Sequence, residues 1–256
     1  MRIRILGCGP SNGMPSLNRG FGLCDSQNPK NIRTRSAALI KLTNQKNILI
    51  DADPEIRQQL LNADNPVVDA VLFTHSHYDH MGGADDLRTL SERINKPLPV
   101  YLTQTDANHF QSMLNYLFQK KERIQLFDMR IIEFYQPFYI AGYEIIPIMQ
   151  EHGEGEFSTG YKVGSKFAYS TDVKKMEKRG FDLLTGLDTW VLGGTTRKVN
   201  NKHINLDEAL TWINTLKPRQ VYLTHMGMRM DYETLCNELP LSIRPAYDGL
   251  EFDVNE

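Results

Sequence analysis

Four side chains of the kinds that bind metal ions stand within six positions of one another. They are His75, His77, Asp79 and His80, in the stretch T-H-S-H-Y-D-H-M-G-G. Imidazole nitrogen and carboxylate oxygen are ligands that borderline divalent ions prefer, and no thiolate accompanies them, which favours zinc, manganese or iron over copper. A lone loop histidine is more often a solvated side chain, but four such residues in one short loop predict a metal site.

The order of these ligands predicts two ions rather than one. The first two histidines are expected to point to one ion, while Asp79 and His80, one step further round the turn, face a second. Gly82 and Gly83 follow directly. We expect these glycines to let the backbone turn sharply into a helix over 84–95.

Three predicted strands end in a threonine that is followed by a candidate ligand. The pairs are Thr74-His75, Thr171-Asp172 and Thr224-His225. A further histidine, His152, follows a predicted strand over 143–148. Because side chains at strand ends converge on one edge of a sheet in α/β proteins, these residues are expected to meet.

The segment before the ligand loop predicts a helix over 55–61. Ile56, Leu60 and Leu61 are expected on its inner face. Asp51, just ahead of it, has two interpretations that stay open. Its carboxylate either orients a ligand histidine, as metal sites generally require, or caps the helix.

A second helix is predicted over 106–118, with Thr105 as its cap. His109 lies one position off the apolar stripe of this helix and is interpreted as a surface residue rather than a ligand. The segment 120–130 is less regular and is a candidate flap. The larger region 101–135 is either a lid or a partner surface. Further along, Asn205 and Glu208 form the pattern of a capping box.

The spacing H-x-H-x-D-H resembles the signature of the metallo-β-lactamase superfamily, in the form of its binuclear hydrolases. The resemblance implies an α/β fold of the αββα type, two mixed β-sheets flanked by helices, in a single domain over 1–256. It also implies two divalent metal ions, zinc or manganese. The implied ligands are His75, His77 and His152 for one ion and Asp79, His80 and His225 for the other, with Asp172 bridging them.

Two N-terminal segments, 7–15 and 28–36, resemble the PhnP-like branch, the phosphoribosyl cyclic phosphate phosphodiesterases. The first is rich in glycine, and its amides either face the metal site or form a plain turn. Some members of the branch hold an additional zinc with several cysteines in this N-terminal region, but between the two segments only Cys24 is present, so no such site is expected. His203 resembles the branch's substrate-facing histidine, which implies a proton donor, protonated at working pH, or a phosphate contact.

These residues together predict a metal-dependent phosphodiesterase that acts on a small cyclic or nucleotide-like phosphate ester. A hydroxide bridging the metals would be the nucleophile, Asp79 would bind metal and orient this hydroxide, and His203 would protonate the leaving group. A nuclease resembling the tRNA 3′-processing enzymes and a thioester or lactone hydrolase are alternatives on the same metal core. A metal-binding scaffold without activity is a further alternative.

Composition indicates which classes of partner and which cellular compartment to expect. The chain has 256 residues, 41% of them hydrophobic, and a formal net charge of −2. That length supports one sizeable core, and the charge gives no general attraction to nucleic acid or membranes. The resemblance to the PhnP-like branch implies a small phosphate ester as the partner, and a homodimer stays open. Three dispersed cysteines and the absence of a signal or membrane-spanning segment favour the cytoplasm.

Overall fold

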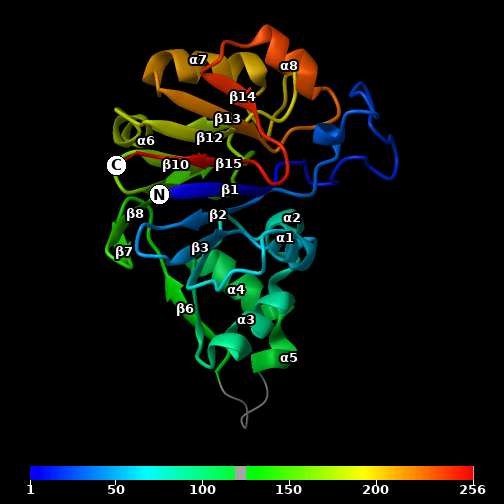
Figure 1. The fold of residues 1–256 in the computed structure, drawn as a ribbon. Helices are drawn as coiled ribbons and strands as arrows, with labels where there is room; N and C mark the ends of the chain where they lie inside the picture. The colour runs from blue at the N-terminus through cyan, green and yellow to red at the C-terminus, as the bar shows by residue number, and fades with distance from the viewer. Residues whose placement is uncertain (119–124, 256) are drawn as a thin grey trace.

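The computed structural model describes residues 1–118 and 125–255. Two β-sheets are stacked face to face, and helices cover the outer face of each (Figure 1). Helices α7 and α8 lie over the outer face of the second sheet, while α1 to α5 lie on the side of the first sheet. This is the αββα arrangement expected from the ligand signature.

The first sheet has the strand order β15-β1-β2-β3-β4-β5-β6. Its strands are β1 (Arg2–Gly7), β2 (Ala37–Lys41), β3 (Asn47–Ile50), β4 (Ala70–Leu72), β5 (Leu98–Leu102), β6 (Phe127–Ile131) and β15 (Glu251–Asp253). Strands β15 to β3 pair antiparallel and β3 to β6 pair parallel, so the sheet is mixed.

The second sheet has the order β11-β8-β9-β10-β12-β13-β14, with β7 paired to β8. Its strands are β7 (Phe138–Ile140), β8 (Tyr143–Glu151), β9 (Phe157–Val163), β10 (Phe167–Ser170), β11 (Lys175–Met176), β12 (Thr189–Gly193), β13 (Gln220–Thr224) and β14 (Ile243–Pro245). Strands β10, β12, β13 and β14 run parallel, so their carboxyl ends share one edge.

Short helices connect and cover the strands. They are α1 (Ile56–Asn62), α2 (Tyr78–Met81), α3 (Leu87–Ile94), α4 (Gln104–Met113), α5 (Asn115–Phe118), α6 (Lys178–Leu183), α7 (Leu206–Leu216) and α8 (Tyr232–Glu238), with 3₁₀ turns η1 (Pro29–Asn31) and η2 (Ala84–Asp86). The capping box predicted for α7 is confirmed, because Asn205 accepts from the Glu208 amide and Glu208 accepts from the Asn205 amide.

The core has two parts. Alternating residues of β1, Ile3 and Ile5, are fully buried between the sheets, where Trp190 also packs. On the other face of the first sheet, Phe73 packs against Phe110 of α4, with ring centroids 5.7 Å apart. Period-two burial in the strands thus leaves one face for the inter-sheet core and one for the helices.

Two predicted details of the helices are wrong. Thr103 caps α4 through its side chain, because the chain becomes helical two residues earlier than predicted. Leu61 is 46% exposed. It lies five positions after Ile56, which rotates it away from the inner face of α1.

Two further expectations concern local backbone. Gly82 and Gly83 have ordinary negative φ angles of −64° and −94°, so they do not make a special turn. Gly83 is required for space instead, because a Cβ there would lie 2.0 Å from the Asp53 carbonyl oxygen. In the candidate flap 120–130, β6 begins at Phe127, while residues 119–124 lie outside the described residues.

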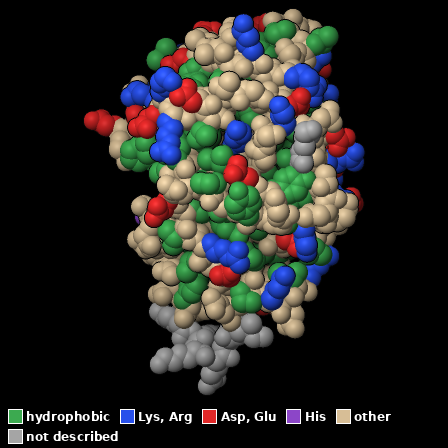
Figure 2. All heavy atoms as spheres, turned by 90° about the vertical axis from the view of Figure 1, so that its left-hand side faces the viewer, with side chains coloured by type: hydrophobic (Ala, Val, Ile, Leu, Met, Phe, Trp, Pro, Cys, Tyr) green, Lys and Arg blue, Asp and Glu red, His purple; other side chains and the backbone are tan. Residues whose placement is uncertain are grey.

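The face that carries β7, β8 and both termini shows basic and acidic side chains interspersed (Figure 2). Arg2 of β1 pairs with Asp253 of β15, and Lys175 of β11 pairs with Glu151 of β8. Among the described residues, no helix combines the length and apolar character needed to cross a membrane.

Candidate metal centre

The seven predicted ligands lie together where their strands end. His75 follows β4, His152 follows β8, Asp172 follows β10 and His225 follows β13. Three overlapping groups of ligand atoms lie within 4.8 Å of one another: His75, His77 and His152; Asp79, His80, Asp172 and His225; and His152, Asp172 and His203. The first two groups are those implied by the resemblance, and the third adds His203.

Asp172 lies between the two groups. Its Oδ2 is 3.1 Å from His80 Nε2, and its Oδ1 is 3.5 Å from the Nε2 atoms of both His152 and His225. One carboxylate therefore contacts histidines of both groups, which is the geometry a bridging ligand needs.

Four of the imidazoles are held through Nδ1, which directs Nε2 into the centre. The Nδ1 partners are Asp51 Oδ2 for His80 at 2.7 Å, the Lys202 carbonyl for His152 at 2.9 Å, Ser36 Oγ for His225 at 3.2 Å and Thr74 Oγ1 for His75 at 3.0 Å. The Nε2 atoms of His75 and His80 are buried without a hydrogen bond. Buried donors or acceptors left unpaired in this way fit metal ligands.

Asp51 orients a ligand histidine, and the helix-cap interpretation is wrong. Its Oδ2 faces His80, and its two oxygens also accept from the amide and hydroxyl of Thr74 at 2.8 and 2.9 Å. The residue at the cap of α1 is Glu55. Asp51 therefore joins the ends of β3 and β4 to the ligand loop.

The electrostatics of the centre follow from burial and from charges held close together. Burial raises the pKa of Asp172, but His225 and His80 beside it outweigh burial and hold that pKa well below its usual range. Burial lowers the pKa of His75, and His80 lowers it further, so His75 is a neutral imidazole. A carboxylate anion and a neutral imidazole are the forms that bind divalent ions.

Three residues of the centre have left-handed backbone conformations. The φ angles are 64° for Asp51, 50° for Asp172 and 54° for His225. Such angles are uncommon outside glycine and concentrate at functional sites. In each case the preceding residue ends or follows a strand, so the left-handed residue turns its side chain from the sheet edge into the centre.

His203 lies beside the predicted ligands. Its Nδ1 is 3.6 Å from Asp172 Oδ1 and makes no hydrogen bond. Burial lowers the pKa of His203 to about 3. Burial thus favours a neutral imidazole in this geometry, and protonation of His203 at working pH stays a prediction.

A cavity of about 410 Å³ opens beside His75, His77 and His152. His109 also lines it, exposed and bonded to Ser76 Oγ at 2.8 Å, and belongs to none of the ligand groups. Its interpretation as a surface residue agrees with this position. Since Thr103 and its neighbours in α4 line the same cavity, the first part of the region 101–135 borders the centre.

The Ser36 hydroxyl and the Lys202 carbonyl hold two ligand histidines, and neither was predicted from the sequence. Ser36 Oγ donates to the Gly9 carbonyl at 2.9 Å as well as contacting His225. The glycine-rich loop thus supports the centre through a carbonyl, while the Gly9 amide bonds to the Thr34 carbonyl. No local pattern marks such long-range partners.

A family model described as a β-lactamase superfamily domain matches residues 46–226, a span that includes every predicted ligand. This chain belongs to the metallo-β-lactamase superfamily. The crystal structure of a diphosphatase from the PhnP family is 29% identical to this superfamily member, with a TM-score of 0.91, and the match covers 99% of this chain and 98% of that one. The predicted fold and the PhnP-like resemblance are confirmed.

Two curated relatives extend the comparison. An octanoyltransferase of Porphyromonas gingivalis (strain ATCC BAA-308 / W83) is 32% identical over all of this chain, which spans only 52% of that relative. Its name therefore belongs to a protein about twice as long. The anti-Pycsar protein Apyc1 of Bacillus phage BSP38 is 25% identical, covering 77% of this chain and 84% of that protein. Superfamily membership and fold imply divalent metal ions and support a metal-dependent hydrolase.

Proposed function

We propose that this superfamily member is a phosphodiesterase that hydrolyses a small cyclic or nucleotide-like phosphate ester with two divalent ions, zinc or manganese. The observation that supports it most is the position of Asp172, whose carboxylate contacts histidines of both adjacent ligand groups. The seven residues implied by the signature would hold the ions: His75, His77, Asp79, His80, His152, Asp172 and His225. Their nitrogen and oxygen donors suit either metal.

When bound, the ions would lower the pKa of water and stabilise the negative charge that develops on phosphate oxygens. The residues around them orient the reactants. Asp79 is buried, and burial raises its pKa, but His80, whose Nε2 lies 3.2 Å from Asp79 Oδ2, outweighs burial and keeps the carboxylate ionised. An ionised Asp79 accepts a hydrogen bond from the attacking water and holds it in line with the phosphorus.

His203 is proposed as a contact for the substrate rather than as a ligand. Its imidazole lies beside Asp172 on the side of the loop that follows β12. As a neutral ring it donates one hydrogen bond, to a phosphate oxygen or to the leaving oxygen. The cavity lined by His75 and His77 receives the organic part of the substrate.

A second candidate function is hydrolysis of a diphosphate linkage. It is favoured by the PhnP-family diphosphatase, whose chain matches this one over nearly its full length. The same ligand set serves both reactions, because each places charge on the oxygens of the phosphate that is attacked. A small substrate is favoured over nucleic acid, since the net charge is −2.

The test measures hydrolysis by metal-stripped protein that is reloaded with zinc or manganese. The substrates are bis(p-nitrophenyl) phosphate, a nucleoside diphosphate, a thioester and a lactone. Asp172→Ala removes the shared carboxylate, and Asp182→Ala, an exposed residue of α6, is the matched control. We expect diester turnover that requires metal, falls at least about 10³-fold in Asp172→Ala and persists in Asp182→Ala.

The substrate that is cleaved distinguishes the two candidate functions. Turnover of the diphosphate without the diester would support the second function. Cleavage of the thioester or lactone alone would overturn both phosphate functions while leaving a metal-dependent hydrolase.

A further inference from the structure

His109 of α4 contacts the ligand loop although it belongs to none of the ligand groups. Its Nδ1 lies 2.8 Å from the Oγ of Ser76, the residue between His75 and His77. The other ring nitrogen, Nε2, has no hydrogen-bond partner in the described part of the chain. The ring is exposed and lines the cavity beside the metal centre. The protein therefore holds one nitrogen of His109 and leaves the other available to a ligand.

Asp106, one turn before His109 on α4, lies behind Ser76. Asp106 is only 6% exposed, and its Oδ2 accepts a hydrogen bond from Thr103 Oγ1 at 2.6 Å. Burial raises the pKa of Asp106, and hydrogen bonds from Thr103 and from the hydroxyl and amide of Ser76 oppose that effect. These donors favour the ionised carboxylate, which only accepts hydrogen bonds. The Ser76 hydroxyl therefore donates its proton to Asp106.

This direction of hydrogen bonding fixes the tautomer of His109. A serine hydroxyl has one proton, so when Ser76 donates to Asp106 its oxygen accepts from His109 Nδ1. The neutral imidazole of His109 then carries its proton on Nδ1 and a lone pair on Nε2. Nε2 is therefore a hydrogen-bond acceptor at the cavity and not a donor.

The cavity beside the metal centre has the size and the lining to receive an organic group. Its volume is about 410 Å³, and Phe134 and Phe157 give it apolar walls. Its exposed acid, Glu156, already accepts a hydrogen bond from Lys202 Nζ at 2.8 Å. His109 adds a neutral acceptor to a lining that otherwise suits an aromatic or sugar ring.

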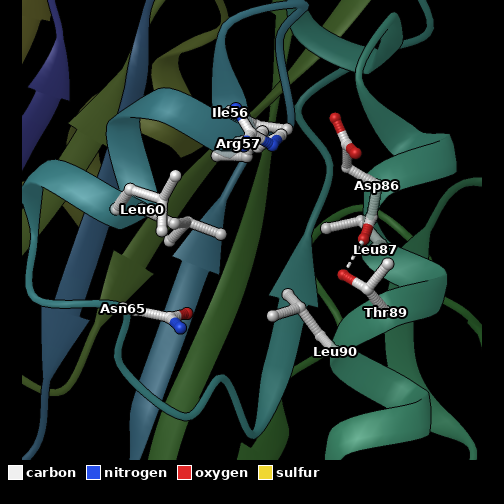
Figure 3. A pocket seen from close by; sticks show the side chains of 9 residues that line it. Ile56, Arg57, Leu60, Asn65, Asp86, Leu87, Thr89 and Leu90 are labelled. Atoms are coloured by element: carbon white, nitrogen blue, oxygen red, sulfur yellow. Dashed lines mark hydrogen bonds between the residues drawn. The ribbon is translucent and has the colours of Figure 1, made fainter.

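The cavity between α1 and α3 differs in both respects (Figure 3). Leucine side chains of the two helices line it, among them Leu60 and Leu90, and none of its lining residues belongs to a ligand group. The Thr89 hydroxyl in that lining donates to the Asp86 carbonyl at 2.8 Å. An unpartnered histidine nitrogen next to the ligand groups thus distinguishes the cavity that His109 lines.

We propose that His109 is a substrate-contacting residue whose Nε2 accepts a hydrogen bond from a hydroxyl or amino group on the organic part of the substrate. Ser76 and Asp106 are positioning residues that hold the ring in this orientation. The inference rests on the proposed function and narrows its substrate class. The favoured substrates are phosphate compounds whose organic part carries a hydrogen-bond donor.

The orientation of the ring is tested by nitrogen-15 NMR on metal-stripped protein at about pH 8.5, above the usual pKa of histidine. The His109 signals are those that disappear in His109→Phe. We expect a protonated Nδ1 and an unprotonated Nε2. Ser76→Ala should move part of the proton population to Nε2, whereas Ser112→Ala, which removes an exposed serine of α4, should leave the tautomer unchanged. A protonated Nε2 in the natural sequence, or no change in Ser76→Ala, would overturn the inference.

The contact is tested on metal-loaded protein with two substrates. Adenosine 2′,3′-cyclic phosphate carries hydroxyl and amino donors, whereas the organic groups of bis(p-nitrophenyl) phosphate carry none. We expect kcat/KM of His109→Phe to fall about tenfold for the adenosine compound, because one hydrogen bond is lost, and to change less than about twofold for bis(p-nitrophenyl) phosphate. His109→Gln, which keeps an acceptor oxygen, should lose less than His109→Phe.

An equal fall for both substrates would mean that His109 acts only through the ligand loop, and it would overturn the contact. Unchanged values for both substrates would overturn it as well. If the natural sequence cleaves neither compound, the proposed function fails, and NMR decides the contact separately. The His109 Nε2 signal should then move when adenosine 2′,3′-cyclic phosphate is added to metal-stripped protein, and an unmoved signal would overturn the inference.

Discussion

Among single residues, Asp51 shows how a side chain outside the ligand set determines the geometry of the centre. Its carboxylate accepts hydrogen bonds from Thr74 and faces His80 Nδ1 at 2.7 Å, in a fully buried position. Burial raises the pKa of Asp51, and His80 opposes that effect. The His80 ring is therefore held with Nε2 toward Asp79 and Asp172.

Asp51→Asn tests this orienting role. The substitution removes the charge and replaces one acceptor oxygen with a donor, so His80 loses its preferred orientation. We expect metal affinity to fall about 10–100-fold, measured by competition with a chromophoric chelator. Asp69→Asn, which alters the ion pair of Asp69 with Lys46 at the opposite end of β3, is the control. Unchanged affinity in Asp51→Asn with native circular dichroism would contradict the role.

On the scale of elements, the ligand loop is fixed by close packing against the segment between β3 and α1. The Ala52 amide donates to the His80 carbonyl and the Gly83 amide donates to the Ala52 carbonyl, both at 2.8 Å. Gly83 lies so near the Asp53 carbonyl that a Cβ would overlap it. Two hydrogen bonds and close packing therefore hold the ligand loop against the segment between β3 and α1.

Gly83→Ala is expected to lower the free energy of unfolding by about 3 kcal/mol, because the overlap displaces backbone that no rotamer can clear. Gly186→Ala is the comparison. Gly186 has a φ of 79° and open space around it, so only backbone strain of about 1 kcal/mol applies. Urea denaturation measures both. Equal losses of unfolding free energy in the two variants would contradict this expectation. They would show that the backbone around Gly83 accommodates the added methyl group at no extra cost.

Asp53, in the segment between β3 and α1, is a buried acid. One of its carboxylate oxygens has no hydrogen-bond partner. Its Oδ1 accepts from the Glu55 amide at 2.7 Å, while its Oδ2 makes no hydrogen bond. Burial raises the pKa of Asp53 to about 8. Below about pH 4 the carboxyl is protonated in both folded and unfolded chains, whereas between pH 4 and 8 only the unfolded chain ionises, so stability falls as pH rises.

Asp53→Asn removes that pH-dependent loss and keeps the acceptor for the Glu55 amide. We expect about 2 kcal/mol of added stability at pH 7 and little change at pH 4. Thermal unfolding at both pH values measures the difference, with Asp182→Asn as an exposed control. A destabilised variant at pH 7 would mean that Asp53 is ionised in the folded protein.

At the scale of the whole molecule, the metal centre joins the two sheets. The loop after β4 in the first sheet supplies His75, His77, Asp79 and His80, and the second sheet supplies His152, Asp172 and His225. Ions held by both sets would connect the sheets at one edge. Binding to the folded chain alone stabilises it by mass action.

Metal removal should therefore lower the melting temperature. With ions at about 100 times their dissociation constant, binding adds about 2.7 kcal/mol, which corresponds to roughly 5–10 °C for a chain of this size. Differential scanning fluorimetry with and without a chelator measures the shift. The Asp172→Ala variant should respond much less to the chelator, and an equal response would place the stabilising ions elsewhere.

The sequence by itself determined the chemistry of the centre and the class of fold. The dense ligand loop, the threonine–ligand pairs at strand ends and the capping box of α7 are local patterns, read over a few residues. Such patterns depend on side-chain type, backbone periodicity and short-range hydrogen bonds, which the chain order contains directly. The αββα fold and the grouping of the ligands were implied by the resemblance of the ligand loop to the superfamily signature.

Only the tertiary structure decided which distant atoms complete these sites. Ser36 and His225 are 189 positions apart, and the Lys202 carbonyl is 50 positions from His152. One cavity likewise joins residues near position 19 to residues near position 229. Contacts of this range arise from the packing of whole loops against one another, and no spacing in the sequence records them. The same holds for the burial that lowers the pKa of His203.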